Sequence, residues 1–226
     1  MIEVKNVSKI YKMGKEEFAA LNNVSLIINE GDFLSIVGPS GSGKSTLMHL
    51  IGGLDTPTTG SICIEGKDIS KLKDKQMAKY RNNTIGFVFQ AFNLENTQTA
   101  LENVMMPLIF AGVSGKERKL KAINALKMVD LEDKLKNKPT EMSGGQRQRV
   151  SIARALVNSP KIIFADEPTG NLDSKNGTNV MELLKNLNRK GYTIIMVTHN
   201  VEDAKEAKRI IKIRDGEIQE VTRDEI

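Results

Sequence analysis

Cysteine, aromatic residues and long apolar runs are all scarce in this sequence. The single cysteine, Cys63, excludes an internal disulfide and any metal cluster built from cysteines. No apolar run approaches the roughly 20 residues that span a bilayer, and no basic segment followed by an apolar one opens the chain. We therefore expect a cytoplasmic protein.

The charge balance is basic, with 33 Lys and Arg residues against 28 Asp and Glu residues. A basic protein can bind nucleic acid. Here, however, aromatic residues make up only 4% of the chain, and the lysines are scattered rather than grouped with aromatic side chains. We interpret the excess as a solvated surface and expect no nucleic-acid partner. Attraction to a nucleoside triphosphate or to an anionic membrane face is a secondary interpretation.

A glycine-rich stretch at residues 38–46 reads GPSGSGKST and follows an apolar run at residues 33–37. It fits the pattern G-x-x-x-x-G-K-[ST] of the phosphate-binding P-loop, placed between a strand and a helix. Glycines let the backbone turn so that successive N–H groups face an anion. The alternative is an ordinary glycine-rich turn capping a helix. It is disfavoured because the Gly-Lys-Ser ending and the strand–helix context both match.

The predicted P-loop supplies three kinds of group to a bound phosphate. The following helix adds the positive end of its dipole. Lys44 supplies a point charge for the β- and γ-phosphates, and Ser45 offers a hydroxyl to Mg²⁺. The predicted phosphate-binding residues are Gly38, Ser40, Gly41, Ser42, Gly43, Lys44, Ser45 and Thr46.

A second glycine pair stands at the start of a predicted helix, in the sequence Ser143-Gly144-Gly145-Gln146. Ser143 and Gln146 have the S-x-x-Q spacing of a capping box, which is one interpretation. The other interpretation, which we favour, is a second anion site at a helix N-terminus. Two phosphate sites in one nucleotide-hydrolysing chain favour a composite active site.

Two strands of buried type end in polar residues. The strand predicted over residues 85–90 ends in Gln90, and the strand over 161–167 ends in Asp166 and Glu167. Parallel sheets bind ligands at the carboxyl ends of their strands. Asp166 is placed to hold Mg²⁺ through water, and Glu167 to orient or deprotonate an attacking water. The alternative is that the acidic pair merely terminates its strand.

Three further residues have two interpretations each. Tyr11, at the end of the first strand, either covers the sheet edge or offers a flat ring to an adenine base. Asp173 follows the acidic strand and could simply cap the next helix. His199 ends the strand predicted over residues 192–199. A lone histidine is usually structural, but one at this sheet edge could contact a γ-phosphate.

The segment from about residue 91 to 158 is helical in pattern. A helix over 99–110 is expected to be interrupted at Pro107. Another helix is expected to open with Ser114 and Glu117 as a capping box. Its apolar residues fall along one face and comprise Leu120, Ile123, Leu126 and Val129.

These segments predict one domain with an inserted part. Strands over residues 2–11, with a slip near Asn6, and over 24–28 indicate an N-terminal antiparallel β subdomain, and residues 13–18 look like a hairpin connection. Residues 210–214 and 217–221, with Asp215 and Gly216 between them, indicate a closing β-hairpin with an Asp-Gly turn. The 226 residues then form a single α/β P-loop NTPase domain with a RecA-like parallel sheet core. The core with its β subdomain is predicted over 1–90 and 159–226, and a helical subdomain over 91–158.

Taken in order, the motifs resemble those of the ATP-binding-cassette (ABC) ATPase domain over essentially the whole chain. The most specific piece is residues 142–156, which is similar to the ABC signature and its helix. A narrower resemblance, to the MacB/LolD/FtsE-type branch, rests on residues 53–57, 87–90, 99–104 and 166–174. Two departures are Met142 in place of the commoner Leu, and the lack of a proline in residues 93–96.

The resemblance implies an ATPase in which two subunits sandwich two ATP molecules head to tail. Each ATP would lie between the P-loop of one chain and Ser143, Gly144 and Gly145 of the other, with Gln146 in the same motif. By the same analogy, Tyr11 stacks on adenine. Ser45 and Gln90 ligate Mg²⁺, and Asp166 reaches it through water. Glu167 is the general base, His199 is the γ-phosphate sensor, and Asp173 couples the two sites.

The resemblance also implies a separate integral-membrane permease that docks around Gln90 to Val113. The chain would then be peripheral on the inner face of the cell membrane. Permeases of that branch move peptides, lipoproteins or antibiotics, or transmit force. One alternative is a soluble ABC ATPase acting on nucleic acid or ribosomes, although the chain lacks the second cassette, coiled coil or basic linker usual there. Another is a P-loop kinase of small molecules, which leaves residues 143–146 without a role.

Overall fold

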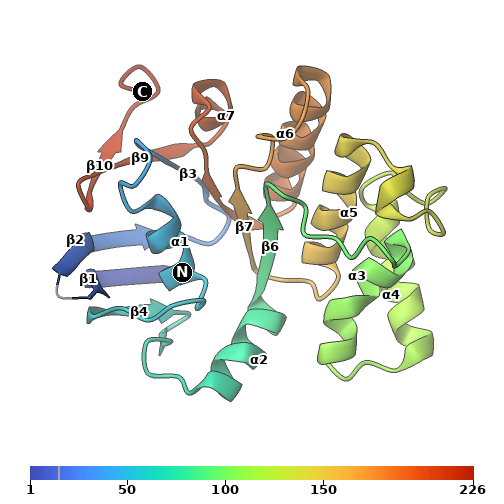
Figure 1. Cartoon of the computed structure of the whole chain (residues 1–226), viewed down its shortest axis with the longest axis horizontal. Coiled ribbons are helices and arrows are strands. Elements are labelled where there is room, and N and C mark those ends of the chain that lie inside the picture. Colours follow the sequence, from blue (N-terminus) through green and yellow to red (C-terminus); the bar gives the residue numbers. More distant parts are fainter. Residues whose placement is uncertain (15) are drawn as a thin grey trace. The chain divides into compact units, whose positions relative to one another are not determined.

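The computed structural model describes residues 1–14 and 16–226, and the chain divides into two compact units (Figure 1). The first unit comprises Met1–Ala78 and Thr193–Ile226, and the second comprises Lys79–Tyr192. Each unit is described by itself. The subdomain boundaries expected near residues 90 and 159 stay a prediction.

The first unit contains an antiparallel sheet with the strand order β2-β1-β4-β5. Its strands are β1 (Ile2–Met13), β2 (Glu16–Ile28), β4 (Thr59–Ile64) and β5 (Lys67–Asp68). The pairing of β1 with β2 shifts register between Val4 and Val7, around Asn6 with its positive φ of 50°. The slip predicted near Asn6 is therefore confirmed.

The β1–β2 hairpin is longer than its apolar pattern indicated. β2 begins at Glu16 rather than Val24, and Met13 pairs with Glu16. The connection expected over residues 13–18 is thus wrong for Met13 and for 16–18, while Lys15 lies outside the described residues. Strand pairing uses backbone groups, so it continues where the alternation of side chains has already ended.

The first unit also contains a group of parallel strands that leads into the glycine-rich loop. β3 (Phe33–Val37) lies between β8 (Thr193–Val197) and β9 (Arg209–Arg214), parallel to both. The first four residues of β3 are fully buried, as expected for a strand covered on both faces. α1 (Lys44–Ile51) contacts β8, and α7 (Val201–Lys205), which the sequence analysis did not predict, contacts β3.

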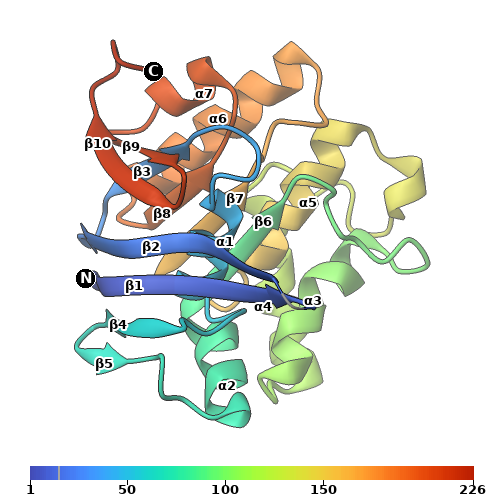
Figure 2. The same cartoon turned by 60° about the vertical axis from the view of Figure 1, so that its left-hand side comes forward.

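A closing hairpin completes the first unit. β10 (Glu217–Val221) pairs antiparallel with β9 across Asp215 and Gly216, whose φ angles are 51° and 78°. Positive φ at both central residues is what an Asp-Gly hairpin turn requires, so this predicted hairpin is confirmed. Figure 2 shows β10 and β9 on one side of β2, with β4 beyond β1 on the other side.

The second unit is built on two parallel strands and a group of helices. β6 (Ile85–Phe89) pairs with β7 (Ile162–Asp166), and α5 (Gly144–Leu156) packs against β6. A Cβ on Gly86 would come 2.5 Å from the Ala155 carbonyl oxygen, so helix and strand approach closely here. The other elements are α3 (Ala100–Phe110), α4 (Gly115–Lys127), a 3-10 turn (Pro139–Glu141) and α6 (Ser174–Arg189). α2 (Asp74–Thr84), which was not predicted, crosses the boundary between the units.

Two predictions about the helical segment are wrong in detail. α3 continues through Pro107 to Phe110. A proline inside a helix removes one backbone hydrogen bond. The capping box of Thr99 with Glu102 and the burial of Val104 and Leu108 keep the helix continuous.

α4 begins where predicted, but its cap and its buried face differ from the prediction. Ser114 is the N-cap residue, yet its side chain makes no capping hydrogen bond. Leu120 is 61% exposed, whereas the fully or nearly buried positions are Ala122, Ala125, Leu126 and Val129. α4 packs against α3 and α5, and small alanines let the helices approach. Packing rather than hydrophobicity alone therefore selects the buried face.

Candidate functional site

The P-loop in the first unit has a backbone that requires glycine at particular positions. Gly38, Gly41 and Gly43 have φ angles of 148°, 79° and 107°. A Cβ on Gly38 would lie 2.2 Å from the carbonyl oxygen of Ile213, and a Cβ on Gly43 would lie 2.4 Å from that of Ala20. These contacts are with backbone, which cannot move aside easily, so side chains are excluded from both positions.

The ammonium group of Lys44 is hydrogen-bonded to the backbone at the start of this loop. Its Nζ donates hydrogen bonds to the carbonyl oxygens of Gly38 at 2.9 Å and Pro39 at 2.8 Å. Lys44 is also the first residue of α1, so the helix N-terminus adds partial positive charge beside the ammonium group. Ser45 follows with an exposed side chain. The loop thus combines a cation, backbone N–H groups and a hydroxyl.

His199 leaves the first unit's parallel strands at the same edge as the P-loop. Ile36 of β3 lies opposite Val197 of β8, and the Thr198 N–H donates to the Ile36 carbonyl at 3.2 Å. Because the strands are parallel, Gly38 and His199 each follow two residues later at one edge. The His199 side chain is exposed.

Tyr11 is half-buried near the end of β1 and is held by its hydroxyl group. The hydroxyl donates to Oδ2 of Asp55 at 2.8 Å, and Nζ of Lys9 lies 4.9 Å from the ring centroid. Burial raises the pKa of Tyr11, and the hydrogen bond to Asp55 raises it further, while a side-chain interaction with Thr46 of the P-loop opposes both. Asp55 in turn follows the P-loop helix, because its N–H donates to the His49 carbonyl at 3.3 Å. Both interpretations of Tyr11 stay open.

In the second unit, Gln90 and the acidic pair come from one edge of the β6–β7 pair. Phe89 lies opposite Asp166, so Gln90 and Glu167 follow at the same end of parallel strands. Gln90 contacts Gly170, where an added Cβ would meet its Nε2 at 2.6 Å. Its carbonyl oxygen accepts a hydrogen bond from Nδ2 of Asn171 at 3.0 Å.

Glu167 has an unusual backbone conformation. Its φ is 46°, a left-handed conformation that residues other than glycine adopt infrequently. The N–H of Gly170 donates to the Glu167 carbonyl at 3.0 Å, which closes a tight turn directly after β7. Such strain concentrates at functional sites, where the surrounding structure maintains it.

The Ser-Gly-Gly-Gln segment caps α5 as a complete capping box. The Gln146 N–H donates to Oγ of Ser143 at 3.3 Å, and the Ser143 N–H donates to Oε1 of Gln146 at 3.0 Å. The capping interpretation is therefore confirmed. It does not exclude the anion site, because Gly144 and Gly145 carry first-turn N–H groups for which a helix provides no internal acceptor. A Cβ on Gly145 would lie 2.2 Å from Oδ1 of Asn176.

Asp173 is the N-cap of α6. Its carboxylate accepts hydrogen bonds from the Asn176 N–H at 2.9 Å and from the Asn176 side-chain amide at 2.7 Å. These bonds hold the pKa of Asp173 below its ordinary value. The capping interpretation is confirmed, and the coupling role stays a prediction. Through Asn176, this cap lies against Gly145 at the start of α5.

The sequence analysis assigned no role to two residues that hold these segments in place. Gln148 is fully buried on α5 and donates from Nε2 to the Pro168 carbonyl at 2.7 Å, directly after Glu167. The only available signal was its place among apolar neighbours on the helix. Asp55, which binds Tyr11, gave no signal, because it lies 44 residues further along the chain.

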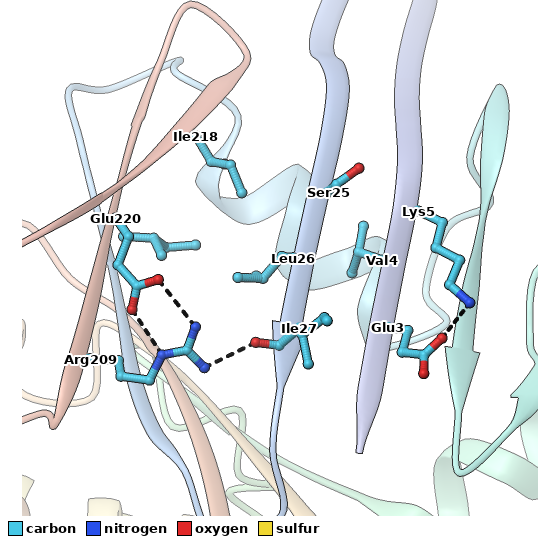
Figure 3. A pocket seen from close by; sticks show the side chains of 10 residues that line it. Glu3, Val4, Lys5, Ser25, Leu26, Ile27, Arg209, Ile218 and Glu220 are labelled. Atoms are coloured by element: carbon cyan, nitrogen blue, oxygen red, sulfur yellow. Dashed lines mark hydrogen bonds and ion pairs between the residues drawn. The ribbon is translucent and has the colours of Figure 1, made fainter.

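A separate cavity of about 520 Å³ lies in the first unit between β1–β2 and β9–β10 (Figure 3). Its charged side chains pair with one another. Nε of Arg209 donates to Glu220 at 2.9 Å, Nη1 of Arg209 donates to the Ile27 carbonyl at 2.9 Å, and Lys5 forms an ion pair with Glu3. The cations of this cavity are thus neutralised, which distinguishes it from the P-loop.

Two kinds of feature are absent from residues 1–14 and 16–226. Within that range, no group of three or more His, Cys, Asp and Glu residues is arranged to hold a metal ion. No helix formed by those residues has the length and hydropathy to span a membrane.

A P-loop between a parallel strand and a helix, with a second parallel strand ending in Asp and Glu, defines the class of P-loop NTPases. Comparison with known proteins identifies the family. The family model described as ABC transporter matches residues 21–170, and the chain belongs to this family.

Close relatives cover nearly the whole chain. An uncharacterized ABC transporter ATP-binding protein of Thermotoga maritima is 50% identical over 99% of this chain and 95% of its own length. MJ0796 of Methanocaldococcus jannaschii is 54% identical over 97% of this chain and 95% of its own length. The macrolide export ATP-binding/permease protein MacB of Mannheimia succiniciproducens is 52% identical over 96% of this chain, which corresponds to 34% of MacB.

Solved structures agree with this assignment. MJ0796, solved as a dimer in a post-hydrolysis state bound to ADP and Pi, has a TM-score of 0.90 at 51% identity, covering 99% of both chains. CbiO1 from Clostridium perfringens, part of an ABC transporter complex, has a TM-score of 0.87 at 28% identity, covering 99% of this chain and 89% of its own. The predicted α/β P-loop NTPase fold is confirmed. The chain is an ATP-binding ABC ATPase that hydrolyses ATP as the cassette subunit of a transporter.

Proposed function

We propose that two copies of this chain close around two ATP molecules, with the P-loop of one copy and residues 143–145 of the other on each nucleotide. The observation that carries this proposal is the start of α5. Its capping box uses the N–H groups of Ser143 and Gln146 and leaves those of Gly144 and Gly145 directed out of the helix end. The dimeric arrangement of MJ0796, with ADP and Pi bound, supports the same geometry.

The P-loop residues bind and orient the phosphates in this proposal. Backbone N–H groups come from Gly38, Ser40–Gly43 and Thr46, and Lys44 supplies the cation that attracts the β- and γ-phosphates. The ring of Tyr11 is the platform for adenine. Its hydrogen bond to Asp55 supports this role, because the Asp55 N–H donates to the His49 carbonyl at the end of the helix that carries Lys44.

Mg²⁺ would be held by Ser45 and Gln90, with Asp166 acting through a water molecule. Their side chains present oxygen donors, which Mg²⁺ prefers, and few of them, which suits an ion that retains much of its water shell. Gln90 and Asp166 also belong to adjacent ends of paired strands. Once bound, the ion offsets negative charge on the phosphates.

Glu167 is the general base for hydrolysis in this proposal. Its carboxylate takes a proton from the water as the water oxygen attacks the γ-phosphorus. The left-handed backbone of Glu167 supports the assignment, because the turn after β7 determines where the side chain points. His199 contacts the γ-phosphate in this proposal. Asp173 couples the two nucleotide sites across the interface between the two copies.

The partner proposed for the dimer is a separate integral-membrane permease similar to that of MacB, and the transport direction is export. The substrates would be peptides, antibiotics or lipoproteins, or the complex would transmit force. This chain matches about a third of MacB, which is named as an ATP-binding/permease protein. Docking around residues 90–113 is supported by Ile109 and Phe110, whose side chains are 52% and 78% exposed at the end of α3. Docking would hold the chain at the inner face of the membrane.

The test is the mass in solution of the Glu167→Gln variant, with and without Mg-ATP. Slow hydrolysis in this variant should preserve the ATP-bound dimer. We expect the 25.0 kDa chain to double in mass only when Mg-ATP is present. Lys44→Ala in the same background is the control and should stay monomeric. If the Glu167→Gln chain binds Mg-ATP at full occupancy yet remains a monomer, the proposal that two copies close around ATP without a further partner is contradicted.

A further inference from the structure

Tyr11 belongs to a three-residue cluster with Lys9 and Asp55, all within the first unit. The Tyr11 hydroxyl donates to Oδ2 of Asp55 at 2.8 Å. Nζ of Lys9 donates to Oδ1 of Asp55 at 2.7 Å and to the Thr56 carbonyl at 2.8 Å. The Asp55 carboxylate therefore uses one oxygen for the tyrosine and the other for the lysine.

The backbone of Asp55 is hydrogen-bonded to the end of the P-loop helix. The carbonyl of His49, on the last turn of α1, accepts hydrogen bonds from the N–H groups of Leu54 at 2.8 Å and Asp55 at 3.3 Å. α1 begins at Lys44, so the residue that holds the Tyr11 hydroxyl is continuous with the helix that carries the phosphate-binding lysine.

The loop after α1 is also bonded to β1 on both sides of Lys9. The Thr58 N–H donates to the Ser8 carbonyl at 2.9 Å, and Oγ1 of Thr58 accepts from the Ile10 N–H at 3.0 Å. These two bonds keep Asp55 in register with the strand that presents Tyr11.

The cluster is shielded from solvent enough to restrict its side chains. The Lys9 and Asp55 side chains are 12% and 29% exposed. Burial alone raises the pKa of Asp55. Hydrogen bonds from Lys9, the Thr56 N–H and Tyr11 outweigh that effect and hold the pKa below its ordinary value. The carboxylate is therefore charged at neutral pH and accepts from all three donors.

The geometry restricts the aromatic ring to one orientation. Its hydroxyl is bonded to Asp55, and the Lys9 ammonium lies 4.9 Å from the ring centroid, over one face. A base can stack only on the other face. A ring already held in its binding orientation loses less conformational entropy when the ligand arrives.

We propose that Asp55, supported by Lys9, is a positioning residue for nucleotide binding. It holds the Tyr11 ring in place for the adenine base and connects that ring to the P-loop helix. The inference rests on the proposed role of Tyr11 as the adenine platform. It predicts that the tyrosine hydroxyl contributes to nucleotide binding at a position where a phenylalanine ring would offer the same stacking surface.

The test compares ADP with inorganic pyrophosphate, titrated calorimetrically into the isolated full-length chain. ADP carries the base, and pyrophosphate lacks it. Asp55→Ala and Tyr11→Phe should each weaken ADP binding about three- to tenfold, the range for a lost hydrogen bond, and leave pyrophosphate binding unchanged. The double variant should lose little more than either single variant, because both remove the same interaction.

Two controls separate this inference from the proposed function. Asp68→Ala removes another carboxylate of the first unit, which pairs with Lys71 at 3.2 Å and has a lowered pKa, and it should leave ADP binding unchanged. Tyr11→Ala removes the platform itself. If Tyr11→Ala binds ADP as wild type does, the proposed role of Tyr11 is wrong and the inference falls with it.

The remaining outcomes concern the inference alone. If Tyr11→Ala weakens ADP binding while Asp55→Ala does not, Asp55 does not position the ring. Equal losses for ADP and pyrophosphate in Asp55→Ala would show that Asp55 supports the loop fold instead, which also overturns the proposal. Tyr11→Phe keeps the ring and every charge, so it provides the same comparison if Asp55→Ala does not fold.

Discussion

In the proposed function, Lys44 and Glu167 have separable tasks at the residue scale, since one would bind phosphate and the other would accept a proton. We expect Lys44→Ala to weaken ATP binding, because it removes the cation that lies within the loop beside the Gly38 and Pro39 carbonyls. We expect Glu167→Gln to retain ATP binding and to slow hydrolysis at least ~100-fold, the typical contribution of a general base.

Equilibrium binding of ATP and steady-state phosphate release distinguish these two effects. Glu182→Gln on α6 is a suitable control, since it makes the same change at an exposed carboxylate that pairs with Lys185 and Arg189. Normal turnover in Glu167→Gln would remove the general-base assignment.

The Asp55 carboxylate should make stability depend on pH. Its folded-state pKa lies below the ordinary value of 3.8, so the unfolded chain binds more protons at acidic pH. The contribution of Asp55 to the free energy of unfolding is fully present above the pKa that it has in the unfolded chain. That contribution is lost as pH falls through the pKa that it has in the folded chain. We expect the free energy of unfolding of Asp55→Asn to decline less steeply than that of wild type below about pH 4, near that unfolded pKa. Urea titrations at several pH values measure the slopes, and identical slopes would contradict the expectation.

At the scale of elements, Gln148 connects α5 to the turn after β7. The substitution Gln148→Met keeps the side-chain length and removes the donor to the Pro168 carbonyl. Leaving a buried carbonyl unpaired costs about 1–3 kcal/mol. The buried Oε1 of Gln148 has no hydrogen-bond partner in the described structure, so its removal offsets part of that cost.

The net expectation for Gln148→Met is a loss of about 1 kcal/mol in the free energy of unfolding. Chemical denaturation measures it. Gln219→Met, on the exposed side of β10, is the matched control and should stay within about 0.5 kcal/mol of wild type. Equal stability of both variants would show that the bond from Gln148 contributes nothing net.

Element-scale predictions succeeded where a short local pattern suffices. The S-x-x-Q spacing at residues 143–146 predicted a capping box that forms, and the Asp-Gly pair at 215–216 predicted the closing turn. They failed where neighbours decide. The same local pattern at Ser114 forms no side-chain cap, and Leu120 remains exposed while Ala122 is buried. A helix has several faces, and its packing partners select among them.

At the scale of the whole molecule, residues 143–145 should matter for pairing of two copies and not for nucleotide binding by one. We expect Ser143→Arg, combined with Glu167→Gln, to prevent the ATP-dependent doubling of mass and to leave ATP binding by the monomer unchanged. A bulky cation at this helix N-terminus blocks approach of a second chain and opposes the helix dipole. Light scattering and a nucleotide-binding titration on the same sample measure both quantities.

The control for that experiment must separate a lost interface from a damaged helix. Ser143→Asn keeps a good N-cap without adding charge or much bulk, and it should pair more readily than Ser143→Arg. If Ser143→Arg also abolished monomer binding of ATP, the composite-site proposal would be wrong, because the signature segment would then act on the nucleotide of its own chain.

By itself, the sequence determined those features whose physics is local. The P-loop needs left-handed backbone angles at fixed spacing, which glycines at 38, 41 and 43 provide. Buried strands that end in Gln90 or in Asp166 and Glu167 place polar groups at a sheet edge regardless of what surrounds them. The fold class and the ABC ATPase family could therefore be predicted from one sequence.

Only the tertiary structure decided the contacts between distant residues. It joined Tyr11 to Asp55, Gln148 to Pro168 and Gly145 to Asn176. It also gave Glu167 its left-handed backbone and kept α3 continuous through Pro107. The physical reason is the same in each case. These outcomes depend on which side chains occupy the space next to a residue, and residue spacing along the chain carries no information about neighbours that folding brings from 20 or 44 positions away.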